Sequence, residues 1–193
     1  MRIGRVLVDS AYGDSTDTVY EAVKFAGVGG VVQVSRGMYF GAASVPMSDV
    51  AAKPGQTLGV HWRIDKVDRR TLRCVTIDTN FWKSFVHARL STPLGDRGAL
   101  SLFREQPHLH STLSDHLRAE YRVRTANKTS GREVDEWKHK PERPDNHWFD
   151  CLVGCAVGAS MLGVSVDGGK SLPSGRGKSM SFAEMQAAAR RRR

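Results

Sequence analysis

The sequence predicts an α/β fold with one central sheet flanked by helices. Apolar runs with the period of β-strands alternate along the chain with segments in which apolar residues recur every three or four positions. This order of elements is typical of layered α/β domains. With 193 residues, 40% of them hydrophobic, the chain is long enough to bury one substantial core. We expect one domain over residues 1–164 and a flexible basic tail over residues 165–193.

The first half of the chain is expected to supply most of the sheet. Residues 3–9 form the first expected strand, because the apolar run at 6–8 indicates burial. A helix follows, capped by Asp17 or by a capping box of Thr18 with Glu21, and glycines at 29–30 end it. A second strand covers 31–35 and a long loop 38–59, and strands at 60–65 and 71–78 pair as a hairpin.

The second half is expected to be mainly helical. A helix covers residues 79–90, a short strand 99–103 and another helix 108–120. A hairpin follows, with strands at 121–126 and 133–139 joined across Thr129-Ser130-Gly131. The last helix covers 145–162 and is apolar on nearly every side.

The net charge of +9 suggests a polyanionic partner. Residues 168–193 contain seven basic side chains against Glu184 alone, so most of the excess charge lies in the tail. This tail is expected to be either a solvated linker or a nucleic-acid contact. A second basic cluster lies in the 60–78 hairpin and is a candidate to follow a DNA backbone: Lys66, Arg69, Arg70 and Arg73.

Several classes of protein are excluded by composition. No apolar run approaches the roughly 20 residues that a membrane helix needs, and the first residues form no hydrophobic targeting region. We therefore expect a cytoplasmic protein without a membrane partner. The three cysteines, Cys74, Cys151 and Cys155, form neither a disulfide framework nor a zinc motif and are expected to pack in the core.

Three aspartates are the main candidates for functional residues. Asp9 and Asp78 each end a predicted strand, where α/β sheets place catalytic groups, although an aspartate there is also a common turn former or helix cap. Asp150 lies in the apolar last helix, where a buried carboxylate must be paired, protonated or bound to a metal. It shares a stripe with Asn146, Gly154 and Gly158, and the glycines allow close approach to the sheet.

Three acids without a cysteine or histidine set predict a hard oxygen-ligand site. Such a site suits Mg²⁺ or Mn²⁺, and paired ions of this kind commonly catalyse phosphoryl transfer. A basic protein with that site is expected to cut nucleic acid, binding it through phosphates. Further candidates are Asp145 as a helix cap that also reaches a metal, His147 beside Asp150, and Asp65, expected to be solvated or a fourth ligand. His108, His110 and His116 are expected at the surface.

Three segments resemble a known family. They are residues 6–13 (VLVDSAYG), residues 75–83 (VTIDTNFWK) with 88–90 (ARL), and residues 143–151 (RPDNHWFDC), of which the last is the most specific. Together they resemble the nuclease domain of the large terminase subunit of lambda-like tailed bacteriophages, in order over residues 3–164. Residues 121–138 also resemble the segment before the family's final helix. Ala11 stands where the family commonly has glycine.

The resemblance implies a ribonuclease H-like fold, with a mixed central sheet flanked by helices. It also implies a two-metal endonuclease that cuts concatemeric double-stranded viral DNA, with acidic ligands at Asp9, Asp78 and Asp150. Lys83 receives no catalytic role. The implied partners are DNA, the terminase ATPase motor, the small terminase subunit and the portal, in the cytoplasm of the infected host. We expect an excised or separately encoded nuclease domain that starts at Met1.

Two other functions stay open from the sequence alone. One is a DNA-binding clamp whose acidic site is vestigial, which would bind duplex DNA without cutting it. The other is a different ribonuclease H-like nuclease, of the resolvase or transposase type, which would prefer branched or end-specific substrates.

Overall fold

The computed structural model describes residues 2–11, 13–27, 30–66, 72–143 and 145–165. A five-stranded sheet has the order β1-β2-β5-β4-β3. Strands β1 (Val6–Asp9), β2 (Val32–Met38) and β5 (Arg73–Asp78) are parallel, whereas β4 (Trp62–Lys66) and β3 (Thr57–Gly59) continue the sheet antiparallel. The expected α/β class is confirmed, and this mixed sheet is compatible with a ribonuclease H-like fold.

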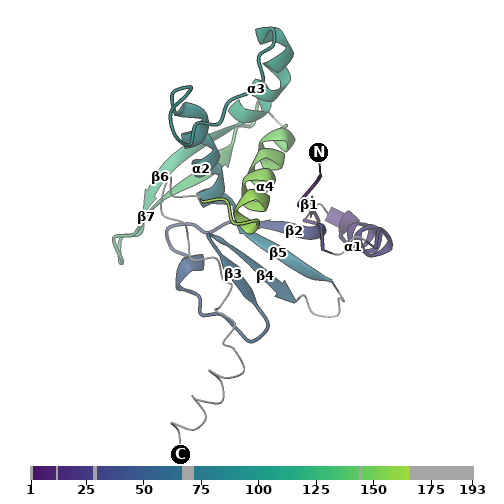
Figure 1. Ribbon diagram of the computed structural model, residues 1–193. Coiled ribbons are helices and arrows are strands. Elements are labelled where there is room, and N and C mark those ends of the chain that lie inside the picture. Colours follow the sequence, from purple (N-terminus) through teal and green to yellow (C-terminus); the bar gives the residue numbers. More distant parts are fainter. Residues whose placement is uncertain (1, 12, 28–29, 67–71, 144, 166–193) are drawn as a thin grey trace, which may run out of the picture.

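Helices cover both faces of the sheet. Helix α1 (Thr16–Phe25) packs on one face, where Tyr20 and Val23 meet Val34 and Cys74. Helices α2 (Thr79–Ser91) and α4 (His147–Met161) pack on the other (Figure 1). Because side chains alternate along a strand, neighbouring residues such as Cys74 and Val75 enter the two different cores.

A separate two-stranded sheet extends the α2 side of the molecule. Strands β6 (Glu120–Ala126) and β7 (Glu133–His139) pair antiparallel, as the sequence predicts, but they do not join the main sheet. Two hydrogen bonds fix β7 on α2. The backbone N–H of Trp137 donates to Oδ1 of Asn80 at 3.0 Å, and its indole N–H donates to Oγ of Ser84 at 2.9 Å. The hairpin is thereby held over the first turns of α2.

Between α2 and β6, the expected strand is wrong and the expected helix is shorter than predicted. Residues 99–103 form no strand, and Phe103 in that segment is 73% exposed, so its apolar residues have no neighbouring strand to cover them. The helix expected at 108–120 is divided into a 3₁₀ turn (Pro107–His110) and α3 (Ser111–Arg118). Glu120 is instead the first residue of β6.

The helix start and the long loop also differ from expectation. A 3₁₀ turn (Gly13–Ser15) leads into α1, so Thr18 lies inside the helix and its capping box with Glu21 does not form. Thr16 instead ties the helix start to β1, donating its hydroxyl to the carbonyl of Ser10 at 2.6 Å. The loop at 38–59 contains a 3₁₀ turn (Met47–Asp49) and β3, an exposed three-residue strand too short to leave a period in the sequence.

Within the described ranges, no helix combines the length and the apolar character that a membrane span requires. The basic tail expected at 165–193 lies, apart from its first residue, outside the described residues.

Candidate functional site

Helix α4, which carries Asp150, packs against β1, which ends at Asp9. A Cβ added at Gly158 would lie 3.5 Å from Cγ of Arg5, which marks one point of contact between the two elements. From Gly158 back to Asp150 the helix extends about 12 Å. From Arg5 forward to Asp9 the strand extends about 13 Å. The negative charge of Asp9 raises the pKa of Asp150, so the two carboxylates lie within electrostatic range of each other, and a shared metal site for them stays a prediction.

Asp9 presents its carboxylate at the exposed end of β1. Its Oδ1 accepts the backbone N–H of Ala11 at 3.2 Å. The next residue, Ser10, is buried and anchors the strand end, because both its backbone N–H and its hydroxyl donate to the carbonyl of Ser35. The position of the Asp9 carboxylate is thus fixed by the backbone while its face stays open to solvent.

The side chain of Asp150 is half-exposed. Partial burial raises the pKa of this carboxyl group, the nearby Lys83 ammonium lowers the pKa, and the negative charges of Glu120 and Asp9 raise it again. The net direction is upward. A cation bound near Asp9 and Asp150 would reduce the repulsion between these two negative charges.

Lys83 is buried against Asp150, with 10% of its side chain exposed. Its Nζ lies 3.1 Å from Oδ1 of Asp150 and 2.5 Å from Oε1 of Glu120. That same Glu120 oxygen accepts the side-chain amide of Asn146, just before α4, at 2.5 Å. The network joins α2, β6 and α4. It gives Lys83 a place in the site that the sequence analysis did not assign.

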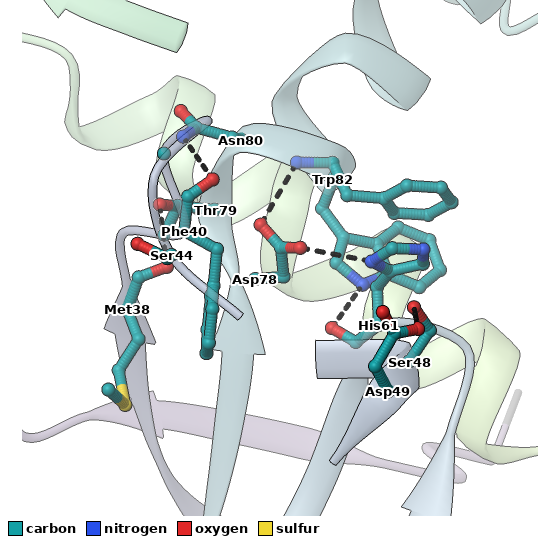
Figure 2. A network of polar contacts seen from close by, with 12 residues as sticks. Met38, Phe40, Ser44, Ser48, Asp49, His61, Asp78, Thr79, Asn80 and Trp82 are labelled. Atoms are coloured by element: carbon teal, nitrogen blue, oxygen red, sulfur yellow. Dashed lines mark hydrogen bonds and ion pairs between the residues drawn. The ribbon is translucent and has the colours of Figure 1, made fainter. Parts of the chain in front are cut away.

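Asp78 lies in a different network. It ends β5 and caps α2, its Oδ1 accepting the backbone N–H of Phe81 at 3.2 Å, while Oδ2 lies 2.9 Å from Nδ1 of His61 (Figure 2). Only 6% of its side chain is exposed. The indole N–H of Trp82 and the backbone N–H of Asp78 both donate to the carbonyl of His61.

The sheet register separates Asp78 from Asp9. Asp9 lies beside Ser35, which lies beside Val75, so Asp78 is three residues further along the sheet. This offset is about 10 Å along the strands and about 10 Å across two strand spacings. In the part of the chain that the structure describes, no group of three or more histidine, cysteine, aspartate or glutamate side chains is arranged to hold a metal ion. The charge of Asp9 acts on Asp150, whereas the register places Asp78 apart from Asp9, and ligand roles for all three aspartates stay predictions.

A comparison with known protein families identifies the family to which this chain belongs. The model of the terminase large subunit gpA endonuclease domain matches residues 1–170. The chain belongs to this family. No curated protein and no solved structure matches the chain. Membership makes this a nuclease domain with a role in phage DNA packaging.

Other acids and histidines of this terminase nuclease domain have structural contacts. Asp65 is buried, not solvated as expected, because Gln56, Arg63 and Thr76 all donate to its carboxylate. Asp145 does not cap α4, since it stands before the Asn146 position that precedes the helix. Among the histidines, the ring of His116 stacks on Trp148 at 5.3 Å, and His147 Nε2 lies 3.8 Å from Asp145.

The cysteines and the basic hairpin residues differ in how far they match the sequence expectations. Cys74 is in the core, but Cys151 and Cys155 are exposed, because α4 buries the opposite stripe of Phe149, Val153 and Val157. Lys66 and Arg73 lie side by side at the exposed ends of β4 and β5. Their companions Arg69 and Arg70 lie outside the described residues.

Proposed function

We propose that this domain is a divalent-metal-dependent endonuclease that cuts concatemeric double-stranded viral DNA during genome packaging. The observation that supports the proposal is the packing of α4 against β1, with the charge of Asp9 acting on Asp150 and the buried Lys83 in contact with Asp150. Family membership supports a nuclease role, and these two carboxylates are the proposed location of its chemistry.

The donor set fits Mg²⁺ or Mn²⁺. Both carboxylates offer hard oxygen atoms, and the exposed side of the pair leaves space for water and DNA phosphate. A protein site for Mg²⁺ commonly has one or two carboxylates, with water and substrate oxygens completing the shell. When bound, such an ion polarises water and phosphate oxygen. We propose that Asp9 and Asp150 are protein ligands of this site, with Asp78 as the third acid.

Neighbouring groups of the chain position these two carboxylates. The backbone bond from Ala11 orients the Asp9 carboxylate, and Lys83 fixes one oxygen of Asp150. Asp78 enters the proposal as the third acid that the family resemblance implies, although in the structure it caps α2. A variant that preserves this cap, Asp78→Asn, separates a ligand role from a structural one.

The proposed substrate and partners follow from the family and the charge. Lys66, Arg69, Arg70 and Arg73 are proposed to contact DNA phosphates without reading sequence. In the packaging system, the domain is proposed to act with the terminase ATPase motor, the small terminase subunit and the portal, in the host cytoplasm.

Supercoiled plasmid tests the proposal directly. The full chain should nick and linearise plasmid in Mn²⁺ or Mg²⁺ and leave it intact in EDTA. Asp96→Asn, which removes an exposed carboxylate beyond the far end of α2, is the matched control and should cleave normally. Tight plasmid binding without cleavage in either metal would instead support a DNA-binding clamp.

A further inference from the structure

Strand β1 lies at an open edge of the main sheet. It is the end strand in the order β1-β2-β5-β4-β3, and among the described strands it pairs with β2 alone. The backbone N–H groups of Val6 and Ser10 donate to carbonyls on the β2 side, at 2.8 and 2.9 Å. Because backbone groups alternate along a strand, the N–H and C=O groups of Leu7 and Asp9 point to the open edge instead.

The side chains at this edge are apolar and only partly covered. All three residues of the run 6–8 are partly exposed, whereas Val34 of the neighbouring β2 is fully buried. On the α1 side of the sheet, Val8 and Val19 line an open apolar groove of about 290 Å³. An unpaired apolar edge of this kind is a template for pairing with a further strand.

The sequence of β1 is complementary to itself. Residues 5–9 read Arg-Val-Leu-Val-Asp. In an antiparallel pair centred on Leu7, this residue meets Leu7 of the second copy, and Arg5 meets Asp9 of the second copy. Leu7 and Asp9 are residues whose backbone groups face the open edge, so these pairs can exchange hydrogen bonds. Opposite charges placed directly across two strands stabilise the pairing.

Arg5 and Asp9 retain bonding capacity for this contact. One terminal nitrogen of Arg5 donates to the carbonyl of Gly30 at 2.8 Å, and its buried Nε has no partner among the described residues. A guanidinium carries five N–H groups, so it can donate to further acceptors. Asp9 is exposed, and its Oδ1 accepts the N–H of Ala11. A carboxylate accepts about four hydrogen bonds, so Asp9 can accept others as well.

We propose that the open edge of β1 binds a second copy of this chain, with the two β1 strands antiparallel about a two-fold axis at Leu7. The same patch then serves both copies, and their main sheets join into one continuous sheet. Arg5 of the second copy stands beside Asp9, so the second copy contributes a positive charge next to a proposed metal ligand. This inference does not depend on the proposed nuclease function, since it concerns the edge alone.

Sedimentation equilibrium of the full chain tests the proposal. About 0.15 M salt screens the repulsion between two copies that each carry a net charge of +9. The expected mass is twice that of one chain, and it should fall to the mass of one chain on dilution. The mass of one chain at every concentration would overturn the proposal.

Charge reversal tests the register. Arg5→Glu places two carboxylates opposite each other at both ends of the pairing, and Asp9→Arg places two guanidinium groups there. Each variant alone should weaken self-association at least about tenfold, because like charges face each other. A 1:1 mixture of the two variants should restore dimers, since the new glutamate then faces the new arginine and the native Arg5 faces the native Asp9.

The mixture keeps this test decisive. If both variants melt cooperatively but the mixture forms no dimers, or if either variant alone dimerises as wild type does, the proposed register is wrong. Arg97→Glu is the matched control, because it reverses an exposed arginine far from β1 in the chain and should leave dimerisation unchanged.

Amide hydrogen exchange locates the interface. The N–H of Leu7 bonds to the second copy in the proposed dimer, so its exchange should slow as the protein concentration rises. The N–H of Val6 already donates within the chain and is the internal reference. Exchange at Leu7 that is independent of concentration, or equally slow in Arg5→Glu, would contradict pairing through β1.

Discussion

Nδ1 of His61 lies 2.9 Å from Oδ2 of Asp78, and the backbone N–H of Asp78 donates to the carbonyl of His61 at 3.0 Å. His61 has a φ of +50°, uncommon for a residue other than glycine, and its ring stacks on Phe81 at 3.7 Å. These contacts join the start of β4 to the start of α2. Asp78 thus fixes the helix that carries Lys83.

Asp78→Ala should destabilise the fold. It removes the cap of α2 and the partner of His61, so the free energy of unfolding should fall by about 2 kcal/mol. Urea denaturation measures this change. Asp78→Asn should stay within about 0.5 kcal/mol of wild type, because asparagine also caps helices.

Cleavage by Asp78→Asn then decides the role of this residue. If a stable Asp78→Asn chain fails to cut plasmid, Asp78 acts as the third acidic ligand that the resemblance implies. If it cuts normally, the role of Asp78 is confined to the cap and to His61. Unchanged stability of Asp78→Ala would contradict the structural role described above.

Asp150 should make stability depend on pH. Its folded pKa is raised, chiefly by partial burial, so the folded chain binds a proton more readily than the unfolded chain. In EDTA, the free energy of unfolding should therefore decrease as pH rises from the unfolded pKa, about 4, through the folded pKa of Asp150. Asp150→Asn should lack this part of the dependence. Parallel wild-type and Asp150→Asn profiles from urea denaturation would contradict it.

The sequence predicts Asp9 and Asp150 because each lies in an unmistakable local pattern. Asp9 follows a continuous apolar strand, and Asp150 interrupts a helix that is otherwise apolar or small. Whether both acids bind one metal site stays a prediction. The exposed Cys151 and Cys155 show the limit of that pattern, since overall apolar composition does not reveal that α4 buries a single stripe.

Lys83 could not be found from local sequence. Its partner Glu120 is 37 residues away, at a position assigned by period to the end of a helix and found at the start of β6. The burial of Asp65 is hidden from the sequence for a similar reason, because its donors Gln56 and Thr76 come from other segments of the chain. The environments of Lys83 and Asp65 are set by tertiary contacts, which local sequence does not show.

Deletion of residues 168–193 should weaken DNA binding. The seven basic side chains in this segment add phosphate contacts, each of which adds about 0.9 to the slope of log affinity against log salt concentration. The truncated chain should bind duplex DNA more weakly at low salt, with a shallower slope, and should still bind Mn²⁺. Equal affinity at low salt would show that the segment serves another purpose, such as docking a packaging partner.

Mn²⁺ affinity of single-carboxamide variants tests the central claim most directly, that Asp9 and Asp150 together hold the ion that cuts DNA. Asp9→Asn and Asp150→Asn should each weaken Mn²⁺ binding at least about tenfold and abolish plasmid cleavage, while their melting curves stay cooperative. Asp96→Asn should match wild type. Wild-type Mn²⁺ affinity in either Asp9→Asn or Asp150→Asn would contradict the account.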